Sequence, residues 1–244
     1  MQKNVYKEAL QHPIFSYISK ASESLAVQTY VIGGFVRDFL LQRGDAKDVD
    51  VVTVGSGIEL AQKVASLLPN KPKVQVFKTY GTAMLRFEGV EVEFVGARKE
   101  SYSEDSRNPQ VETGSLQDDQ NRRDFTINAM ALSLNTADYG LLLDPFDGLK
   151  DMSQKTLKTP LDPDITYSDD PLRMLRAIRF ASQLDFEIVP ESLEAISRNK
   201  ERIDIITRER IVVEINKIML SATPSIGFLL LESTGLLERI IPEL

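Results

Sequence analysis

Strand-like alternation of polar and apolar residues is confined to residues 1–150, and helical spacing dominates the rest of the chain. Short alternating segments, two of them separated by a Glu88-Gly89 turn, predict several strands in the first part. After residue 150 apolar residues recur at helical spacing, and no strand is expected. The sequence therefore predicts a mixed α/β part over residues 1–150 and a helical part over residues 151–244.

The composition narrows the possible functions. Of 244 residues 42% are hydrophobic, which is enough to bury the cores of one or two domains. The chain has no cysteine, which excludes a disulfide scaffold and a cysteine zinc site, and its one histidine, His12, is predicted to lie at the surface. The net charge of -7 argues against attraction of nucleic acid by the field of the whole chain, so binding would need a local basic patch.

Nothing in the sequence predicts insertion into a membrane. Residues 1–13 mix acidic and basic side chains, unlike a secretory signal, and the apolar segments fall short of the roughly 18 residues that cross a bilayer. We therefore expect a cytoplasmic protein. The last helical pattern is still amphipathic at Leu244, which predicts a longer natural protein. The sequence carries no signal for an oligomeric state.

Apolar spacing and turn residues predict the order of the elements. Helices are expected over residues 4–27 with an interruption at Pro13, then over 35–41, 57–68, 119–134, 170–184, 191–199, 208–220 and 225–232, and from Gly235 onward. Strands are expected at residues 29–32, 49–52, 73–78, 81–87, 90–97 and 141–143. Ser56 is expected to cap a helix, residues 99–117 to form a long functional loop, and residues 144–152 to form a turn.

Two adjacent glycines, Gly33 and Gly34, separate an expected strand from an expected helix. The first turn of a helix presents free backbone N–H groups to an anion, and glycine lacks the Cβ that would block close approach. Arg37, one turn further on, adds a charged donor for the same anion. A purely structural turn is the alternative. A P-loop ATPase is not indicated, because the sequence has no GK[ST] after the glycines.

The DVD triplet places Asp48 and Asp50 on one face of an expected strand, about 7 Å apart at Cα. Two carboxylates so placed repel each other unless a cation lies between them, and Mg²⁺ commonly takes one or two carboxylates together with substrate phosphates. Glu93, on a nearby expected strand, offers a third carboxylate, and Glu91 on the same face competes for that role. Such a set suits phosphoryl or nucleotidyl transfer with two metal ions. A solvated strand edge is the alternative.

Two further segments carry candidate nucleotide ligands. In NRRDFTINAMAL, an expected helix brings Arg123, Asp124 and Asn128 within about a turn of one another, where they would bind ribose hydroxyls and triphosphate or form a solvated face.

The helix DDPLRMLRAIRF, capped by Ser168 or Asp169, carries the pair Asp170 and Arg173, followed by Arg176 and Arg179. An Asp-Arg pair offers an acceptor beside a donor, which complements the edges of cytosine and adenine. A local salt bridge with two further surface arginines is the alternative.

The motifs GGFVRD, DVD, GARKESYS, RRDFTINAMAL, DPFDGLKDM, DDPLRMLRAIRF and ITRERIVVEINKIM follow one another from Tyr30 to the end of the chain. In this order they resemble the bacterial CCA-adding tRNA nucleotidyltransferase and poly(A) polymerase family, the class II branch of the polymerase-β-like nucleotidyltransferases. The resemblance implies an α+β fold. A nucleotidyltransferase head over residues 1–150, with a mixed, mainly antiparallel sheet plus helices, would precede an all-helical neck over residues 151–244 that is truncated at its C-terminal end.

The resemblance also implies roles for the candidate residues. Asp48 and Asp50 would hold two metal ions, expected to be Mg²⁺, with Glu93 as a further catalytic carboxylate. The triphosphate would be bound by Gly33, Gly34 and Arg37, and the nucleotide would be contacted by Arg123 together with Asp124 and Asn128. Selection of CTP or ATP would depend on Asp170 and Arg173, with support from Arg176 and Arg179. Residues 99–117 would form the family's flexible loop, and residues 144–152 its hinge between head and neck.

The implied activity is the addition of CMP and AMP from CTP and ATP to the 3′ end of tRNA, with release of pyrophosphate. Poly(A) polymerase and enzymes that add only CC or only A share the same motifs, and a nucleotide- or RNA-binding fragment without turnover is a further alternative. Asp169 stands where the family usually has Glu. The family's body and tail helices, which grip the tRNA elbow, are not in this sequence, so we expect these residues to bind nucleotide better than tRNA.

Overall fold

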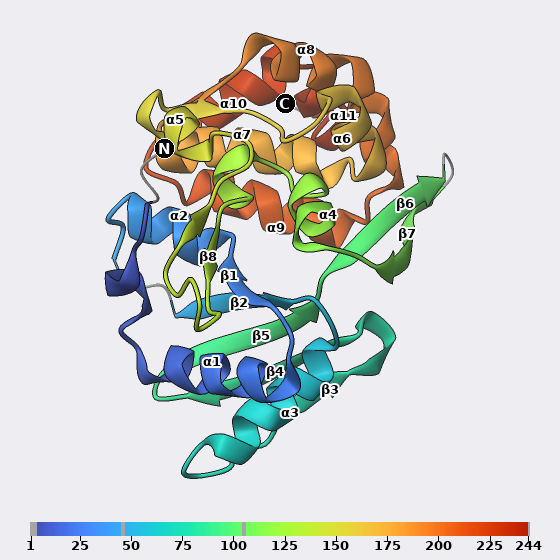
Figure 1. Cartoon of the computed structure of the whole chain (residues 1–244). Helices are drawn as coiled ribbons and strands as arrows, with labels where there is room; N and C mark the ends of the chain where they lie inside the picture. Colours follow the sequence, from blue (N-terminus) through green and yellow to red (C-terminus); the bar gives the residue numbers. More distant parts are fainter. Residues whose placement is uncertain (1–3, 45–46, 104–105, 244) are drawn as a thin grey trace. The chain divides into compact units, whose positions relative to one another are not determined.

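The computed structural model describes residues 4–44, 47–103 and 106–243 (Figure 1). Residues 104–105 of the expected loop and Leu244 of the last expected helix therefore lie outside the described residues. The chain forms two compact units. Unit 1 comprises the described residues up to Glu100, together with Val111–Asn121 and Asn128–Gly148. Unit 2 comprises the described residues within Ser101–Gln110, Arg122–Ile127 and Leu149–Leu244.

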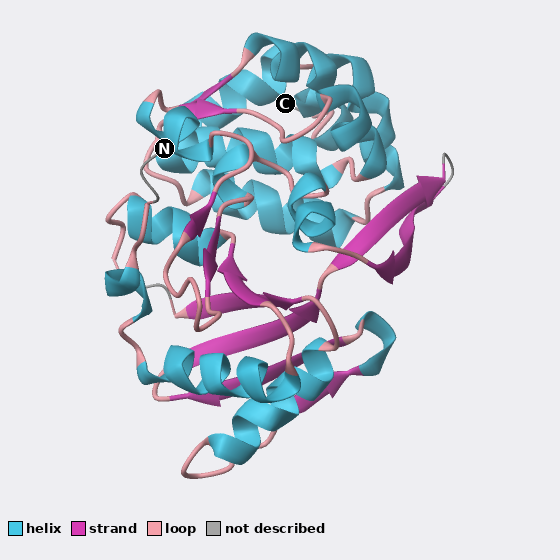
Figure 2. Cartoon of the chain, viewed as in Figure 1, coloured by secondary structure: helices cyan, strands magenta, loops and turns pink. Residues whose placement is uncertain are grey.

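Unit 1 is built on a seven-stranded sheet in the order β3-β4-β5-β2-β1-β8-β9 (Figure 2). β2 and β5 run parallel, and the other neighbouring pairs run antiparallel. The strands are β1 (Thr29–Ile32), β2 (Asp48–Thr53), β3 (Gln75–Phe77), β4 (Thr82–Phe87), β5 (Val90–Gly96), β8 (Ala131–Ser133) and β9 (Leu142–Leu143). The expected mixed, mainly antiparallel sheet is confirmed.

The helices of unit 1 are α1 (Pro13–Leu25), α2 (Gly34–Leu40), α3 (Gly57–Leu67) and α4 (Leu116–Asn121), with 3-10 helices at Lys7–Leu10 and Lys78–Tyr80. Pro13 opens α1 rather than interrupting a longer helix, because proline has no N–H to donate and its fixed φ suits the first helical position. His12 precedes it as the N-cap, and its Nδ1 accepts a hydrogen bond from the backbone N–H of Ile14 at 3.3 Å. Ser56 caps α3 as expected, because its hydroxyl accepts from the N–H of Glu59 at 3.2 Å.

The two faces of this sheet have different surroundings. Val49, Val51 and Phe94 point to one face, where they are fully or almost fully buried, and α1 and α3 lie along that face (Figure 1). Because side chains alternate along a strand, Asp48 and Asp50 point to the opposite face. Gly57 lets α3 approach closely, since a Cβ on it would lie 2.7 Å from the carbonyl oxygen of Phe94.

The prediction of a long loop at residues 99–117 is wrong for the described part of that segment. β6 (Arg98–Ser103) and β7 (Ser106–Thr113) form a two-stranded sheet, and α4 begins at Leu116. Pro109 suggested a loop, but both strands of a two-stranded sheet are edge strands, where proline is tolerated.

The prediction of one helix over residues 119–134 is also wrong. α4 ends at Asn121, a 3-10 helix follows at Thr126–Asn128, and β8 then enters the sheet. The apolar side chains of this segment are buried in different units. Phe125 packs edge-on against Phe180 in unit 2, with ring centroids 5.7 Å apart, whereas Met130 is fully buried in unit 1. A single helix has one continuous apolar stripe and cannot supply both.

Unit 2 is mainly helical. Its helices are α5 (Gly148–Ser153), which begins at the boundary with unit 1, α6 (Pro163–Asp169), α7 (Leu172–Leu184), α8 (Pro190–Asn199), α9 (Arg208–Met219), α10 (Pro224–Ser233) and α11 (Leu236–Ile240), with a 3-10 helix at Lys200–Ile205. α7 is central, since its residues Met174, Leu175, Ala177 and Ile178 are all fully buried. The expectation of a helical second part is confirmed, although the sequence did not reveal α6.

Two details of unit 2 correct the sequence analysis. β10 (Thr156–Leu157) pairs in parallel with β11 (Glu187–Ile188), so the unit is not wholly helical. Ser168 and Asp169 do not cap α7, because they end α6. Pro171 is the N-cap of α7, and Oδ1 of the preceding Asp170 accepts a hydrogen bond from the N–H of Leu172, the first helical residue, at 3.3 Å. Over the described ranges, no helix is both long and apolar enough to span a membrane.

Candidate active site

Four carboxylates share one face of the unit 1 sheet. In the parallel pair β2 and β5, Asp48 lies opposite Glu91 and Asp50 lies opposite Glu93. Neighbouring strands are about 4.8 Å apart, so paired residues on one face have adjacent side chains. Asp48, Asp50 and Glu93 are exposed, whereas Glu91 is half-buried. The sequence placed the two aspartates on one face, and the register of β5 adds the two glutamates beside them.

The two glutamates differ in their partners. Glu91 forms an ion pair with Arg86, with 2.5 Å between Oε2 and Nε. Partial burial and the charge of Asp50 raise the pKa of Glu93, while a hydrogen bond from Thr82 and the charge of Arg98 act against that rise. Glu91 is therefore neutralised by a neighbouring side chain, whereas Glu93 responds mainly to desolvation and to the nearby aspartate.

The glycine pair lies where β1 ends beside β2. Ile32 is paired with Asp50, and Gly33 follows with a φ of 84°, in the region that favours glycine. Gly33 is the N-cap of α2, and Gly34 is its first residue. The turn that the sequence predicted as an anion site is thus adjacent in the sheet to the aspartates, and the free N–H groups of the first helical turn are at this end of α2.

Arg37 is buried one turn further along α2, with an exposed fraction of 9%. Its guanidinium donates to both carboxylate oxygens of Asp38 at 2.9 Å and to Oδ1 of Asn128 at 2.7 Å. Two predicted nucleotide ligands, Arg37 and Asn128, are therefore in direct contact although they are far apart in the sequence. Asp38 as the partner of Arg37 was not anticipated.

The structure does not bring Arg123, Asp124 and Asn128 together on one helix. Arg123 and Asp124 lie in the turn after α4 and belong to unit 2, whereas Asn128 belongs to unit 1. The hydroxyl of Thr126 donates to the buried carboxylate of Asp151 at 2.6 Å, which ties this segment to unit 2. The prediction that the three residues share a helix face is therefore wrong.

Asp124 instead pairs with the arginine-rich helix α7. Its Oδ2 accepts hydrogen bonds from Nε and Nη2 of Arg176, the first at 2.7 Å, and its Oδ1 accepts from the N–H of Phe125 at 2.9 Å. Asp124 is buried, and its charge raises the pKa of Arg176. This pair joins the 122–127 segment to α7 and holds two predicted nucleotide ligands in one ion pair.

Arg179 is paired within the core of unit 2. Its Nε donates to Oε2 of Glu214 on α9 at 2.6 Å, and its Nη1 donates to Gln183 at 2.9 Å. The guanidinium also lies over the ring of Phe180, 4.0 Å from the centroid. Burial lowers the pKa of Arg179 and Glu214 acts against that shift, so the arginine remains charged. Glu214 is the functional partner that the sequence analysis missed.

Asp170 and Arg173 occupy the first turn of α7 with different partners. The guanidinium of Arg173 donates to the backbone carbonyl oxygens of Arg122 at 2.6 Å and Thr166 at 3.4 Å. Asp170, which accepts a hydrogen bond from the N–H of Leu172, lines a pocket of about 370 Å³ together with Arg176 and Glu214. Thus the two side chains predicted to read a base are fixed by backbone groups of α7 and the neighbouring segments.

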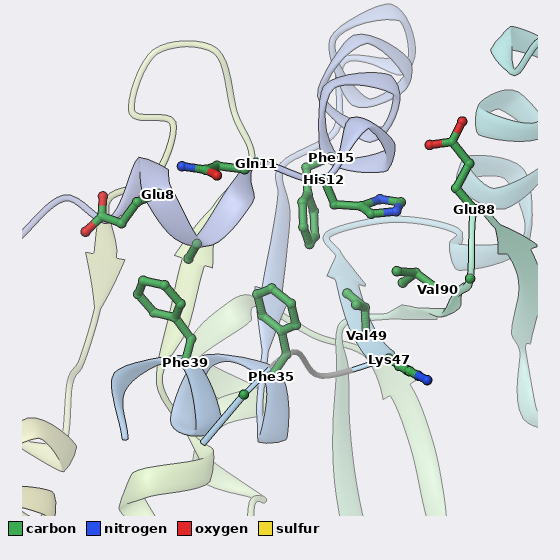
Figure 3. Close-up of a pocket in the computed structure, with 13 residues that line it drawn as sticks. Glu8, Gln11, His12, Phe15, Phe35, Phe39, Lys47, Val49, Glu88 and Val90 are labelled. Atoms are coloured by element: carbon green, nitrogen blue, oxygen red, sulfur yellow. The ribbon is translucent and has the colours of Figure 1, made fainter. Parts of the chain in front are cut away.

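A second pocket, of about 450 Å³, lies in unit 1 away from the carboxylates (Figure 3). Phe35 and Phe39 of α2 face it from one side, and Phe15 and His12 face it from the N-terminal segment (Figure 3). It borders Val49, which points away from the face of its neighbours Asp48 and Asp50. This pocket is therefore on the other side of β2 from the candidate catalytic residues.

Two site residues could not be identified from the sequence for a common reason. Thr82, which interacts with Glu93, lies on the neighbouring strand β4, and Glu214, which binds Arg179, lies on a different helix. Thr82 lies outside the motifs, and Glu214 lies within ITRERIVVEINKIM, which gave no indication that it pairs with Arg179. The only available signal for Glu214 was an acid within the apolar stripe of α9, where a charged side chain needs a partner.

The acidic face has the donor chemistry for a hard divalent cation. Asp48 and Asp50 present exposed carboxylate oxygens on one strand, and Glu93 lies opposite Asp50. Within the described ranges, no group of three or more His, Cys, Asp or Glu side chains is placed to hold a metal ion. The residues therefore fit a site in which two protein carboxylates act with oxygen ligands from a substrate.

Two protein families match the chain. The family described as "Poly A polymerase head domain" matches residues 29–158, which is more than half of the chain. The family described as "Probable RNA and SrmB- binding site of polymerase A" matches residues 185–244.

Known proteins similar to this chain are named as nucleotidyltransferases or CCA-adding enzymes. An A-adding tRNA nucleotidyltransferase of Aquifex aeolicus is 44% identical over 162 residues, which are 66% of this chain and 19% of that protein. A CCA-adding enzyme of Anoxybacillus flavithermus is 38% identical over 219 residues, which are 89% of this chain and 52% of that protein.

A solved tRNA nucleotidyltransferase, complexed with a primer tRNA and an incoming ATP analog, superposes with a TM-score of 0.79 at 33% identity. The match covers 92% of this chain and 62% of that one. The chain thus spans less than two thirds of the length of each of these proteins.

Proposed function

Because the chain belongs to the poly A polymerase head domain family, we propose that it is a nucleotidyltransferase that adds CMP and AMP from CTP and ATP to the 3′ end of tRNA and releases pyrophosphate. The observation that carries this proposal is the exposed carboxylate face of β2 and β5 beside the Gly33-Gly34 turn. Residues 1–150 act as the catalytic head and residues 151–244 as the helical neck that reads the nucleotide.

Asp48 and Asp50 are the metal ligands in this proposal, with two Mg²⁺ ions expected and Glu93 as the further catalytic carboxylate. Glu93 is preferred over Glu91 because Glu91 is already paired with Arg86. When bound, the cation neutralises the charge that develops on the transferred phosphate and lowers the pKa of the attacking hydroxyl. The carboxylates would hold and orient it, and because the pKa of Glu93 is raised, a bound cation would favour the ionised form of this residue.

The phosphate groups of CTP or ATP bind at the start of α2. Gly34 presents its backbone N–H without a Cβ in the way, whereas the N–H of Gly33 donates to the carbonyl oxygen of Met130 at 3.3 Å. Arg37 contributes a guanidinium that is held in place by Asp38 and Asn128.

The nucleobase is selected by Asp170 and Arg173. An acceptor beside a donor complements the exocyclic amine and the unprotonated ring nitrogen of cytosine and adenine. Arg123 contacts the nucleotide. Asp124, Arg176 and Arg179 support the selection by fixing α7 through the Asp124–Arg176 and Arg179–Glu214 pairs.

The test is incorporation of labelled CTP and ATP by the purified chain into a tRNA that ends before CCA, with and without Mg²⁺, and product length read on a gel. Extension by three nucleotides that depends on Mg²⁺ is expected for CCA addition. A-adding relatives make A-only addition the second candidate. A tRNA that already ends in CC identifies it, because an A-only enzyme extends that tRNA and leaves the shorter one unchanged.

Other product lengths distinguish the remaining possibilities. A chain that stops after two cytidines is a CC-adding enzyme, and a long run of adenosines indicates poly(A) polymerase activity. Nucleotide binding by calorimetry without any incorporation would show a binding fragment and would contradict the proposed turnover.

A further inference from the structure

A basic segment interrupts the acidic character of the chain. From Leu60 to Phe87 the sequence contains lysines and one arginine but no Asp or Glu, although the net charge of the whole chain is -7. Lys71, Lys73 and Lys78 fall within its middle part, and all three are exposed. This is the kind of local basic patch that an acidic protein needs in order to contact a polyanion.

The segment includes an exposed aromatic turn at the edge of the sheet. β3 is the first strand in the sheet order, and the 3-10 helix Lys78–Tyr80 connects it to β4. Tyr80 is 72% exposed and Phe77 is 36% exposed. We call Phe77, Lys78 and Tyr80 the β3–β4 turn surface. It combines a cation with two accessible rings in four consecutive positions.

Phe77, the first residue of the β3–β4 turn surface, points to the same face of the sheet as the carboxylates. Phe77 is paired with Thr82, so both point to one face, and Thr82 interacts with Glu93 on the next strand. Along the sheet, Gln75 lies opposite Met84, which lies opposite Glu93. Three strand spacings of about 4.8 Å therefore separate β3 from β2, or roughly 14 Å across the face.

The turn surface and the glycine turn flank the carboxylates on opposite sides. β1, which leads into Gly33-Gly34, is the neighbour of β2 on one side, whereas β5, β4 and β3 follow on the other. In the proposed function the nucleotide triphosphate occupies the glycine side. The side with β4 and β3 is then left for the RNA whose 3′ end is extended. This inference therefore rests on the proposed function.

We propose that the β3–β4 turn surface binds the unpaired 3′ segment of the RNA substrate, with Tyr80 and Phe77 stacking on bases and Lys78 contacting a phosphate. Stacking on aromatic side chains tolerates any base, and lysines follow the backbone, which suits a strand whose sequence changes as it grows. Lysines alone are also common on edge strands, where they prevent sheet-to-sheet association. Lys71 and Lys73 lie before β3 rather than on it, and protection of an edge strand does not require a tyrosine that is 72% exposed.

The direct test is fluorescence anisotropy with the full chain and a fluorescein-labelled single-stranded RNA of about ten nucleotides. Tyr80→Ala should raise Kd about tenfold, because loss of one stacked base has an effect of this order. Tyr80→Phe keeps the ring and should bind as the unchanged protein does. Lys78→Gln should lower the slope of log K against log salt by about 0.7, the value for one phosphate contact on a single strand.

A matched control is Lys20→Gln. Lys20 is an exposed lysine on α1, which covers the other face of the sheet, so its loss should leave Kd and the salt slope unchanged. Thermal melting of each variant should match that of the unchanged chain, since Tyr80 and Lys78 are exposed.

Turnover supplies a second measurement. Tyr80→Ala should raise KM for the RNA and leave KM for CTP and ATP unchanged. Unaltered RNA affinity in both Tyr80→Ala and Lys78→Gln overturns the inference, and so does failure of the unchanged chain to bind the oligonucleotide. Absence of nucleotide incorporation by the unchanged chain contradicts the proposed function instead, and the anisotropy series still decides whether this surface binds RNA.

Discussion

The carboxylate face of unit 1 and the arginine-rich helix of unit 2 differ in the exposure and the surroundings of their charged side chains. On β2 and β5, Asp48, Asp50 and Glu93 are exposed and lie beside other acids. On α7, Arg173 and Arg179 are each 8% exposed, and their guanidinium groups are bound by protein groups. Like charges lie side by side on the first surface, whereas on α7 Arg173 is bound by backbone carbonyl groups and Arg179 by a carboxylate.

This difference separates a surface of adjacent like charges from a helix whose arginines are held by protein groups. Adjacent carboxylates repel each other, and the rise in the pKa of Glu93 records that repulsion together with partial burial. A cation relieves it. In α7 the buried ion pairs are complete, so they fix the helix in place, and removing one partner would leave a buried charge uncompensated. The following predictions test that contrast, from the largest effect to the smallest.

Replacing the aspartates should have the largest effect. Asp48→Asn or Asp50→Asn should lower CTP incorporation by at least about 10³-fold, because the metal contributes several kcal/mol to the transition state. Circular dichroism and melting should show an intact fold, since both side chains are exposed. Glu91→Gln is the matched control on the same face, and it should lose less than about tenfold because Glu91 already pairs with Arg86. Full activity in the Asp50→Asn variant would remove the metal assignment.

Removing a buried partner in unit 2 should have the largest effect on stability. Glu214→Gln leaves Arg179 without its carboxylate, and the free energy of unfolding should fall by about 3 kcal/mol. Urea denaturation measures this change. Glu194→Gln is the control, since its pair with Arg198 is exposed on both sides and its loss should change stability by less than about 0.5 kcal/mol. Equal effects of the two substitutions would show that burial does not distinguish these ion pairs.

Changing Arg173, the arginine proposed to read the base, should alter selectivity more than turnover. Arg173→Lys keeps the charge but loses the planar fork, so discrimination of CTP and ATP against UTP and GTP should fall by about tenfold. The measurement is kcat/KM for each of the four nucleotides with one tRNA. Arg198→Lys, on the exposed surface of α8, serves as the control. Unchanged discrimination in the Arg173→Lys variant argues against a role for α7 in reading the base.

The smallest effect concerns the pH dependence of the acidic face. The fold raises the pKa of Glu93 from 4.5, so its contribution to stability is present below that value and is lost as the pH rises through the raised pKa. Glu93→Gln avoids this loss and, without Mg²⁺, should melt roughly 1 to 3 °C higher than the unchanged chain at pH 7, with little difference at pH 4. Mg²⁺ should stabilise the unchanged chain more than the variant. A variant that melts lower at pH 7 would mean that Glu93 forms a stabilising contact instead.

Local patterns in the sequence determined much of this protein. Alternation along DVDVVT was sufficient to put Asp48 and Asp50 on one face, because side-chain direction in a strand has a period of two residues. The helices of unit 2 from α7 to α10 also agree with their apolar spacing to within two residues. Ser56 was identified as a cap for a similar reason, since a cap acts on the next few residues of the same chain.

Only the tertiary structure decided which distant residues become neighbours. The register of β2 against β5 brings Glu93 opposite Asp50. Sequence spacing predicts one helix over residues 119–134, but Phe125 is buried in unit 2 and Met130 in unit 1, so the segment does not form a single helix. The pairs Arg37–Asn128 and Arg179–Glu214 likewise join residues without a shared motif. Periodicity reports the direction of a side chain within its own element. The partner that a side chain meets depends on how the elements pack, and packing is a property of the whole chain.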